Sequence, residues 1–150
     1  MPDAGRGHIW TRILSVYGPH DGPATMISGT IRKLLHGEKP ALTAGIQQWT
    51  TCTPPTRQLR STRWPSAGRT QGLPAGQRHA RPLKDYIETL RDAIDGAWPL
   101  GLGEVPYGPL QVMHLQADTS ALQEDTGWRP ATPFEEGIRE TIEWVRKETK

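Results

Sequence analysis

The chain has 150 residues, of which 35% are hydrophobic, and a formal net charge of +2. This length fits one domain of ordinary size, but 16 glycines and 14 prolines argue against a single compact core that uses every residue. A single cysteine, Cys52, excludes an internal disulfide, and no apolar run reaches the length of a membrane span or forms a signal peptide, so we expect a cytoplasmic protein.

Residues 8–49 predict a strand, a loop and a helix. A short apolar run predicts a buried strand that stops at the turn signal Tyr17-Gly18-Pro19. After this loop, four apolar residues recur at helical spacing before Gly37, which predicts a helix over 24–36. The strand run consists of Ile9, Ile13, Leu14 and Val16, and the helical face of Ile27, Ile31, Leu34 and Leu35.

Residues 50–80 differ in character from both flanking segments. No Asp or Glu occurs from Lys39 to Lys84, and six of the 18 basic residues are arginines between Thr50 and Arg81. The rest of the chain is therefore acidic, with 12 basic against 16 acidic residues. Because it has no strand or helix period, the segment predicts a disordered linker in preference to a nucleic-acid-binding arm.

Residues 81–150 begin with a second predicted helix. Pro82 stands where a first helical residue would, and an apolar stripe follows that ends at Gly96. Residues 111–115 predict a short strand, and Asp118 can cap a short helix that runs through Glu124 and is closed by Gly127. The stripe consists of Leu83, Tyr86, Ile87, Leu90 and Ile94.

The chain ends in a third predicted helix. Thr132-Pro133-Phe134-Glu135 reads as a capping box with proline at the first helical position. One apolar face follows, formed by Phe134, Ile138, Ile142 and Val145. This regular start and periodicity indicate that the end of the chain folds.

Three stretches carry a resemblance through their order and spacing. The first reads Arg12-Ile13-Leu14-Ser15-Val16-Tyr17-Gly18-Pro19, and the second Lys39-Pro40-Ala41-Leu42-Thr43-Ala44-Gly45. The third, the most specific, combines Ala117-Asp118-Thr119-Ser120, Thr126-Gly127-Trp128-Arg129-Pro130 and Pro133-Phe134-Glu135-Glu136-Gly137-Ile138. Together they resemble the extended short-chain dehydrogenases/reductases, specifically the NAD-dependent epimerases/dehydratases that act on nucleotide sugars.

The resemblance implies an α/β fold, namely the C-terminal, substrate-binding portion of an extended Rossmann-type dehydrogenase or epimerase, incomplete and with a disordered middle. In this interpretation residues 8–49 form a strand-loop-helix-strand part, and residues 81–150 a substrate-side helical portion. Without a central strand and helix between them, the apolar faces at Ile31, Leu34 and Leu90 lack partners, so we expect no stable core.

The family has an aromatic-rich strand and an alanine-rich helix where this chain has residues 50–80. Loss of one base at the Trp49 codon explains the difference. In the shifted frame, the bases that encode Thr50, Thr51 and Thr53 contribute to codons that allow Asp or Tyr. The bases that encode the following prolines and arginines contribute to codons that allow Ala. We therefore predict that Thr50 to about Ala80 is frame-shifted, with the frame regained before Pro82.

The family's catalytic groups are absent from the sequence. Its NAD(P) is held by a glycine-rich turn, but Gly5-Arg6-Gly7 and Gly101-Leu102-Gly103 lack the third glycine at the right place. Its Tyr-x-x-x-Lys pair is also missing, since Tyr17, Tyr86 and Tyr107 have no lysine four residues on. We expect no catalytic residue, no NAD(P) binding and no activity from this chain alone.

Part of a nucleotide-sugar site can remain. By the resemblance, the loop from Ser15 through Tyr17, Gly18 and Pro19 lies beside the substrate pocket, with Arg12 before it, and the turn from Gly45 to Gln48 lies near the nucleotide. A plain turn at Tyr17-Gly18-Pro19 and a solvated strand end at Arg12 are the alternative interpretations.

Other kinds of site find less support. The five histidines are far apart without ligand spacing, so we expect no metal site. A small interaction protein that binds nucleic acid through residues 57–81 is the rival hypothesis, because cationic side chains bind phosphate with little sequence demand. The third hypothesis is an authentic enzyme whose recorded sequence contains a sequencing error.

Overall fold

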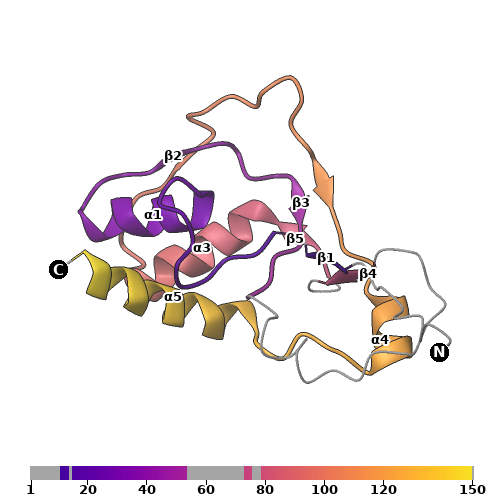
Figure 1. Ribbon diagram of the computed structural model, residues 1–150. Coiled ribbons are helices and arrows are strands. Elements are labelled where there is room, and N and C mark those ends of the chain that lie inside the picture. Colours follow the sequence, from indigo (N-terminus) through magenta and orange to yellow (C-terminus); the bar gives the residue numbers. More distant parts are fainter. Residues whose placement is uncertain (1–10, 14, 54–72, 76–78, 150) are drawn as a thin grey trace, which may run out of the picture.

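Three helices form one layer of the molecule. The computed structural model describes residues 11–13, 15–53, 73–75 and 79–149, and the side chains within 15–53 and 79–149. Helices α1 (Met26–Leu35), α3 (Leu83–Ile94) and α5 (Phe134–Glu148) each pack against the other two (Figure 1). The short helix α4 (Ser120–Thr126) lies apart from them. The predicted helical segments are therefore confirmed.

The core lies where the three helices meet. Their apolar stripes join in one buried cluster, because each helix repeats apolar residues on one face. The residues predicted to lack partners, Ile31, Leu34 and Leu90, are at most 1% exposed in this cluster. That prediction is wrong, since α5 covers the faces of α1 and α3. The cluster consists of Tyr17, Ile27, Ile31, Leu34, Tyr86, Leu90, Phe134, Ile138, Ile142 and Val145.

The strands among the described residues are short and form three small sheets. Strand β1 (Thr11–Ile13) pairs in parallel with β4 (Leu73–Ala75), and β2 (Ala41–Leu42) pairs in parallel with β6 (Gly101–Leu102). In the third sheet, β3 (Gln48–Trp49) lies between β5 (Arg81–Pro82), which is antiparallel to it, and β7 (His114–Leu115), which is parallel. The fold is α/β, as predicted.

The structure corrects the prediction that residues 50–80 contain no strand. Leu73–Ala75 forms β4, and an isolated parallel bridge joins Cys52 to Val16. Thr50, Thr51 and Cys52 are at most 4% exposed, so the start of the segment belongs to the folded body. The predicted disorder and frame shift otherwise fall on residues 54–72 and 76–78, which lie outside the described residues.

Two helix starts differ from the sequence prediction. Pro82 and Pro133 are the N-cap residues of α3 and α5, not their first helical residues, because both have an extended backbone with ψ of 137° and 155°. Pro82 is held extended by its pairing with Gln48 in the third sheet. The predicted capping box needs Thr132 as the N-cap of α5, but the N-cap is Pro133, whose ring cannot form a hydrogen bond, so the box does not form.

The remaining boundaries shift by a few residues. Thr25 caps α1, and its hydroxyl accepts a hydrogen bond from the backbone N–H of Ser28. The strand predicted over 111–115 is confined to His114–Leu115. Helix α4 has Thr119, not Asp118, as its N-cap, although the Asp118 carboxylate accepts a hydrogen bond from the N–H of Ser120. Gly127 ends this helix in the left-handed conformation, as predicted.

Candidate functional site

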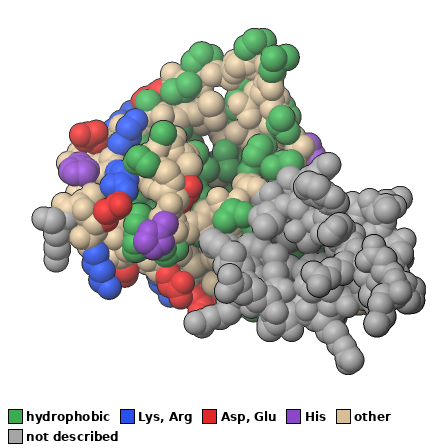
Figure 2. Space-filling model, in the orientation of Figure 1, with side chains coloured by type: hydrophobic (Ala, Val, Ile, Leu, Met, Phe, Trp, Pro, Cys, Tyr) green, Lys and Arg blue, Asp and Glu red, His purple; other side chains and the backbone are tan. Residues whose placement is uncertain are grey.

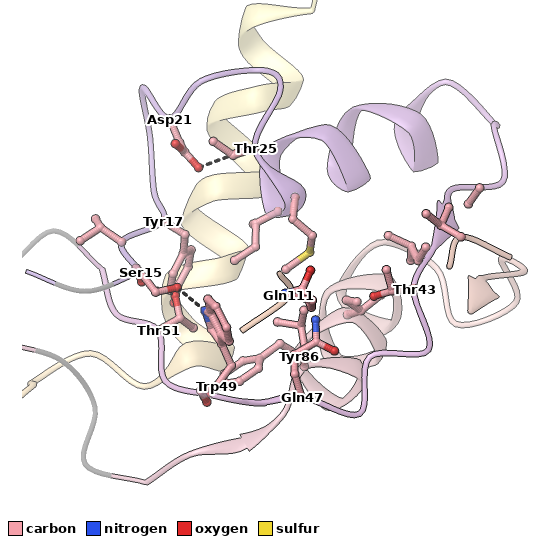
Figure 3. Close-up of a pocket in the computed structure, with 18 residues that line it drawn as sticks. Ser15, Tyr17, Asp21, Thr25, Thr43, Gln47, Trp49, Thr51, Tyr86 and Gln111 are labelled. Atoms are coloured by element: carbon pink, nitrogen blue, oxygen red, sulfur yellow. Dashed lines mark hydrogen bonds between the residues drawn. The ribbon is translucent and has the colours of Figure 1, made fainter. Parts of the chain in front are cut away.

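A pocket of about 470 Å³ opens between α1, α3 and the loops that connect the small sheets. Its walls combine aliphatic and aromatic surface with hydroxyl and amide groups (Figure 3). Asp21 is the one charged residue among those described in the lining. The lining consists of Ser15, Val16, Tyr17, Asp21, Thr25, Met26, Ile27, Ala41, Leu42, Thr43, Gln47, Trp49, Thr51, Leu83, Tyr86, Ile87, Val105 and Gln111.

Ser15 is held in an unusual conformation at the edge of the pocket. Its φ of 48° lies in the left-handed region, which costs a residue other than glycine about 1–2 kcal/mol. Its hydroxyl accepts a hydrogen bond of 2.7 Å from the Trp49 indole, and its carbonyl accepts one of 2.6 Å from the Thr51 hydroxyl. These bonds fasten the first loop to Trp49 of β3 and to Thr51 after it, and Figure 3 shows the bond between Ser15 and Trp49.

Tyr17 lines the pocket and is 1% exposed. Its hydroxyl donates to the backbone carbonyl of Phe134 at 3.3 Å, and the two rings lie 5.0 Å apart. Burial raises the pKa of Tyr17, so the phenol stays protonated. Tyr17 is therefore an anchor between the first loop and α5 that also closes one wall of the pocket.

A glycine on α5 leaves room for this tyrosine. A Cβ at Gly137 would lie 2.6 Å from the Tyr17 hydroxyl oxygen and 2.5 Å from the Thr53 methyl carbon. We expect Gly137→Ala to lower the free energy of unfolding by about 1–2 kcal/mol, because overpacking outweighs the gain in helix propensity of about 1 kcal/mol. Urea unfolding measures this change.

Gly108→Ala is the matched control, because a Cβ at Gly108 meets nothing within 4 Å. We expect its unfolding midpoint to equal that of the unmodified chain. Equal stability of the two variants would show that Tyr17 does not press against α5.

Tyr107 joins a loop to a turn. Its hydroxyl donates to the side-chain oxygen of Gln47 at 2.7 Å and accepts a hydrogen bond of 3.1 Å from the backbone N–H of Ile46. Gln47 is only 4% exposed, so this bond satisfies a buried amide. The contact fixes the loop of residues 103–113 to the turn that follows Gly45.

Arg81 stacks on two aromatic rings beneath the site. Its guanidinium carbon lies 4.2 Å from the ring centre of Tyr86 and 5.3 Å from that of Phe134, and it pairs with Glu135 at 3.0 Å. Burial raises the pKa of Tyr86, against the opposing effect of Arg81. The pKa of Glu135 is lowered, first by its own backbone N–H and then by Arg81. Arg81, the last residue of the proposed nucleic-acid segment, is thus engaged within the fold.

The structure brings only some of the predicted site residues to the pocket. Ser15 and Tyr17 line it, whereas Gly18, Pro19 and Gln48 are not among its described lining residues. Gln48 uses its backbone to pair with both neighbouring strands of its sheet.

Gly45 and Arg12 also stand apart from the lining. Gly45 adopts a φ of +66°, and its carbonyl accepts a hydrogen bond from the N–H of Lys84, so it shapes the turn before Gln47. Arg12 lies in β1, but its side chain is outside the described residues.

Several lining residues escaped the sequence prediction. Gln47 and Trp49 stand two positions apart on either side of Gln48, a spacing that could have assigned both to the pocket face of a short strand. Tyr86 is part of the apolar stripe of the second predicted helix, so the sequence predicts a core residue. In the structure its hydroxyl donates a hydrogen bond to the Trp49 carbonyl at 3.1 Å. Sequence periodicity cannot separate such a residue from plain core.

The described lining can hold an uncharged ligand that carries hydroxyl groups. The Asp21 carboxylate accepts hydrogen bonds from the N–H of Gly22 at 2.9 Å and from the Thr25 hydroxyl at 2.7 Å, so it is committed to the start of α1. Among the described residues, no three His, Cys, Asp or Glu side chains gather as a metal site would need. None of the described helices is both long and apolar enough to cross a membrane.

Known proteins resemble this chain in sequence or in fold. The dTDP-glucose 4,6-dehydratase of Salmonella typhimurium is 27% identical over 95% of this chain and 42% of its own length. The UDP-glucose 4-epimerase of Thermotoga maritima, solved with UDP-glucose, has a TM-score of 0.78 and 18% identity over 93% of this chain and 46% of its own. The UDP-glucuronic acid 4-epimerase of Bacillus cereus, solved with UDP-glucuronic acid and NAD, has a TM-score of 0.78 and 16% identity over 93% of this chain and 45% of its own.

No family model matches the chain. It spans less than half the length of each of these three proteins. The alignment with the Salmonella enzyme nonetheless runs through almost the whole chain, and the fold agrees with part of the two epimerases. The chain is a distant homologue of the NAD-dependent epimerases and dehydratases of nucleotide sugars.

Proposed function

We propose that this distant homologue of nucleotide-sugar epimerases and dehydratases is the substrate-side portion of such an enzyme, and that it is inactive alone. The alignment with dTDP-glucose 4,6-dehydratase carries the proposal. It covers 95% of the chain, so the first loop, the pocket and α5 fall within one alignment to a single enzyme. The pocket supports it, since hydroxyl and amide groups around aromatic surface suit a sugar or nucleoside ring.

Within this proposal the residues have different roles. Ser15 and Tyr17 belong to the part of the wall that the loop contributes, and Gly18 and Pro19 complete its turn. Gly45 and Gln48 flank Gln47, which lines the pocket. The diphosphate of a nucleotide sugar needs cations, and no lysine or arginine stands among the described lining residues, so we propose that the pocket takes the uncharged sugar or nucleoside ring and not the diphosphate.

Inactivity follows from the groups that the sequence lacks. Hydride transfer needs a bound NAD and a proton-exchanging tyrosine beside a lysine. The two buried tyrosines of the site, Tyr17 and Tyr86, donate their hydroxyl protons to backbone carbonyls, and burial raises both pKa values. Neither is placed to exchange a proton with a substrate.

The frame shift is part of the same proposal. Thr50, Thr51 and Cys52 run in extended form beside Ser15 and Val16, where backbone bonds such as that from the Cys52 N–H to the Ser15 carbonyl need no particular side chain. The strand can therefore persist although its residues have changed. Reading the DNA from the Trp49 codon onward in the shifted frame tests this, and a shifted frame that contains stop codons, or that does not encode an aromatic-rich strand and an alanine-rich helix, contradicts it.

Ligand binding tests the pocket directly. We expect dTDP-glucose and UDP-glucose to bind with a Kd on the order of 1 mM, about −4 kcal/mol, because the chain supplies only one wall of a site. Saturation-transfer NMR on the full chain detects binding of this strength. No conversion of either sugar is expected when NAD is added.

Ala41→Trp supplies the matched variant, since Ala41 lines the pocket and is exposed at its edge. The indole fills the cavity and should remove the saturation-transfer signal, whereas Ala131→Trp, outside the lining, should leave it intact. A signal that survives Ala41→Trp, or no signal for either ligand with the unmodified chain, contradicts the proposed site.

A further inference from the structure

A second cavity, of about 420 Å³, lies where the turn of residues 20–23 meets α1 and the end of α5. Its volume is within the range of small-molecule sites, and the proposed sugar site does not use it. Figure 2 shows acidic, basic and histidine side chains interspersed over the helical layer that carries it. Besides the turn, its described lining consists of Arg32, Trp144 and Glu148.

Two aromatic rings line the second cavity. The His20 imidazole and the Trp144 indole lie 4.9 Å apart, with their planes at 55° to each other. His20 has a φ of 69°, a left-handed conformation that is strained for a residue other than glycine. Backbone strain that the surroundings maintain is typical of functional sites. The turn thus holds the imidazole against α5 in spite of the strain.

Carboxylates outnumber guanidinium groups in the described lining of this cavity. Asp21 and Glu148 contribute two carboxylates, whereas Arg32 contributes one guanidinium. Arg32 forms an ion pair with Glu148, and its side chain is 23% exposed against 46% for that of Glu148. The Arg32 Nε is buried without a hydrogen-bond partner, so part of this guanidinium faces into the protein. A ligand in the cavity therefore meets more carboxylate than guanidinium.

Both carboxylates keep the capacity to accept hydrogen bonds from a ligand. Glu148 pairs with Arg32 through Oε2, which leaves Oε1 without a partner among the described residues. The two Asp21 oxygens accept one hydrogen bond each, from the Gly22 N–H and from the Thr25 hydroxyl (Figure 3). A carboxylate oxygen can accept two such bonds. The second cavity therefore offers charged acceptors beside an aromatic surface.

This combination favours a planar organic cation. The negative face of an aromatic ring, that of tryptophan above all, attracts a cation. A guanidinium group can stack flat on such a face while its N–H groups donate to a carboxylate. The chain already holds one in this way, since the Arg81 guanidinium carbon lies 4.2 Å from the Tyr86 ring centre and the group pairs with Glu135 at 3.0 Å.

Other classes of ligand fit the second cavity less well. Two carboxylates repel an anion. Among the described residues, no three His, Cys, Asp or Glu side chains gather as a metal ion would need. A neutral sugar ring leaves the negative charge of Asp21 and Glu148 without a partner.

We propose that the second cavity binds a small molecule that carries a guanidinium group. The group stacks on the Trp144 indole and donates a hydrogen bond to Oε1 of Glu148, while Asp21 adds negative charge to the wall. Arg32 opposes this only in part, because Glu148 already compensates its charge. The inference goes beyond the proposed function and does not depend on it.

The probe is n-butylguanidinium, added to the full chain and followed by saturation-transfer NMR. We expect a Kd on the order of 1 mM. Butanoate and n-butanol have a similar carbon chain with negative or no charge, and should bind at least about tenfold more weakly. The n-butylammonium ion is a cation without a flat face, and should bind about threefold more weakly.

Variants on α5 locate the probe. Glu148→Gln retains the shape of the side chain and should weaken binding about tenfold. Glu143→Gln is the matched control, because Glu143 is also on α5 and pairs with Arg146 but is not among the described lining residues of the cavity. Its Kd should equal that of the unmodified chain. Trp144→Leu should weaken binding about threefold or more. Circular dichroism of each variant must match that of the unmodified chain.

Several outcomes overturn the inference. They are no signal from n-butylguanidinium, equal binding of butanoate or n-butylammonium, and the same Kd in Glu148→Gln and Glu143→Gln. Tighter binding of a Gly-Gly-Arg-Gly-Gly peptide than of n-butylguanidinium also overturns it, because the cavity then serves a protein partner. Neither Trp144 nor Glu148 is among the described lining residues of the sugar pocket, so failure at one site leaves the other standing.

Discussion

Replacing Phe134 with alanine is expected to lower the free energy of unfolding by about 3–5 kcal/mol, the range for deleting a buried phenylalanine side chain. Phe134 is 1% exposed, and its ring lies 5.0 Å from that of Tyr17 and 4.7 Å from that of Tyr86. The Arg81 guanidinium lies 5.3 Å from the same ring. One side chain thus joins the first loop, α3 and α5.

The loss should reach the pocket as well as the core. Tyr17 keeps its hydrogen bond to the backbone carbonyl of residue 134, but loses the ring that fixes its orientation. We therefore expect Phe134→Ala to weaken the saturation-transfer signal of dTDP-glucose in addition to lowering the urea midpoint.

Two further variants make the result specific to the ring. Phe134→Leu retains most of the volume and should cost less than half as much as Phe134→Ala. Glu136→Ala changes an exposed residue in the same turn of α5 and should alter stability by less than about 0.5 kcal/mol. If Phe134→Ala costs no more than Glu136→Ala, the three-helix core described above does not exist in solution.

Gly45→Ala is expected to lower the free energy of unfolding by about 2–5 kcal/mol. The φ of +66° costs an alanine about 1–2 kcal/mol, and its Cβ would lie 2.8 Å from the backbone nitrogen of Lys84. Backbone atoms at the start of α3 cannot move aside cheaply, so overpacking adds about 1–3 kcal/mol. Thermal or urea unfolding of the purified chain measures the total.

Gly103→Ala separates the two contributions. Gly103 has a φ of +82°, but a Cβ there meets nothing within 4 Å. It should cost only the conformational part, about 1–2 kcal/mol. Equal losses at Gly45 and Gly103 would mean that the turn before Gln47 does not press on α3.

Helices were predictable from this sequence because each carries its own signal. The stripe from Leu83 to Ile94 and that from Phe134 to Val145 repeat at helical spacing, and burial of those stripes confirms them. Exact starts were less predictable. Pro82 is typical of a first helical residue, but its pairing with Gln48 holds it extended, and that pairing is a long-range contact.

The pocket was predictable only where a local motif forms it. The turn after Ser15 drew attention to Ser15 and Tyr17, and both residues line the described pocket. The bond between Gln47 and Tyr107 joins residues 60 positions apart, and no periodicity or turn signal encodes it. The partners of Ile31 and Leu90 were missed for the same reason, because the sequence does not show that α5 returns across both helices.

Cys52 gives the molecule a built-in reporter of its own opening. It is 4% exposed, burial raises the pKa of its thiol to about 11, and its backbone N–H and carbonyl bond to Ser15 and Tyr17. A thiol reagent attacks the thiolate, so the closed form is nearly inert at neutral pH. Because the chain has one cysteine, the rate at which it is alkylated measures how often the first loop separates from the segment that contains Cys52.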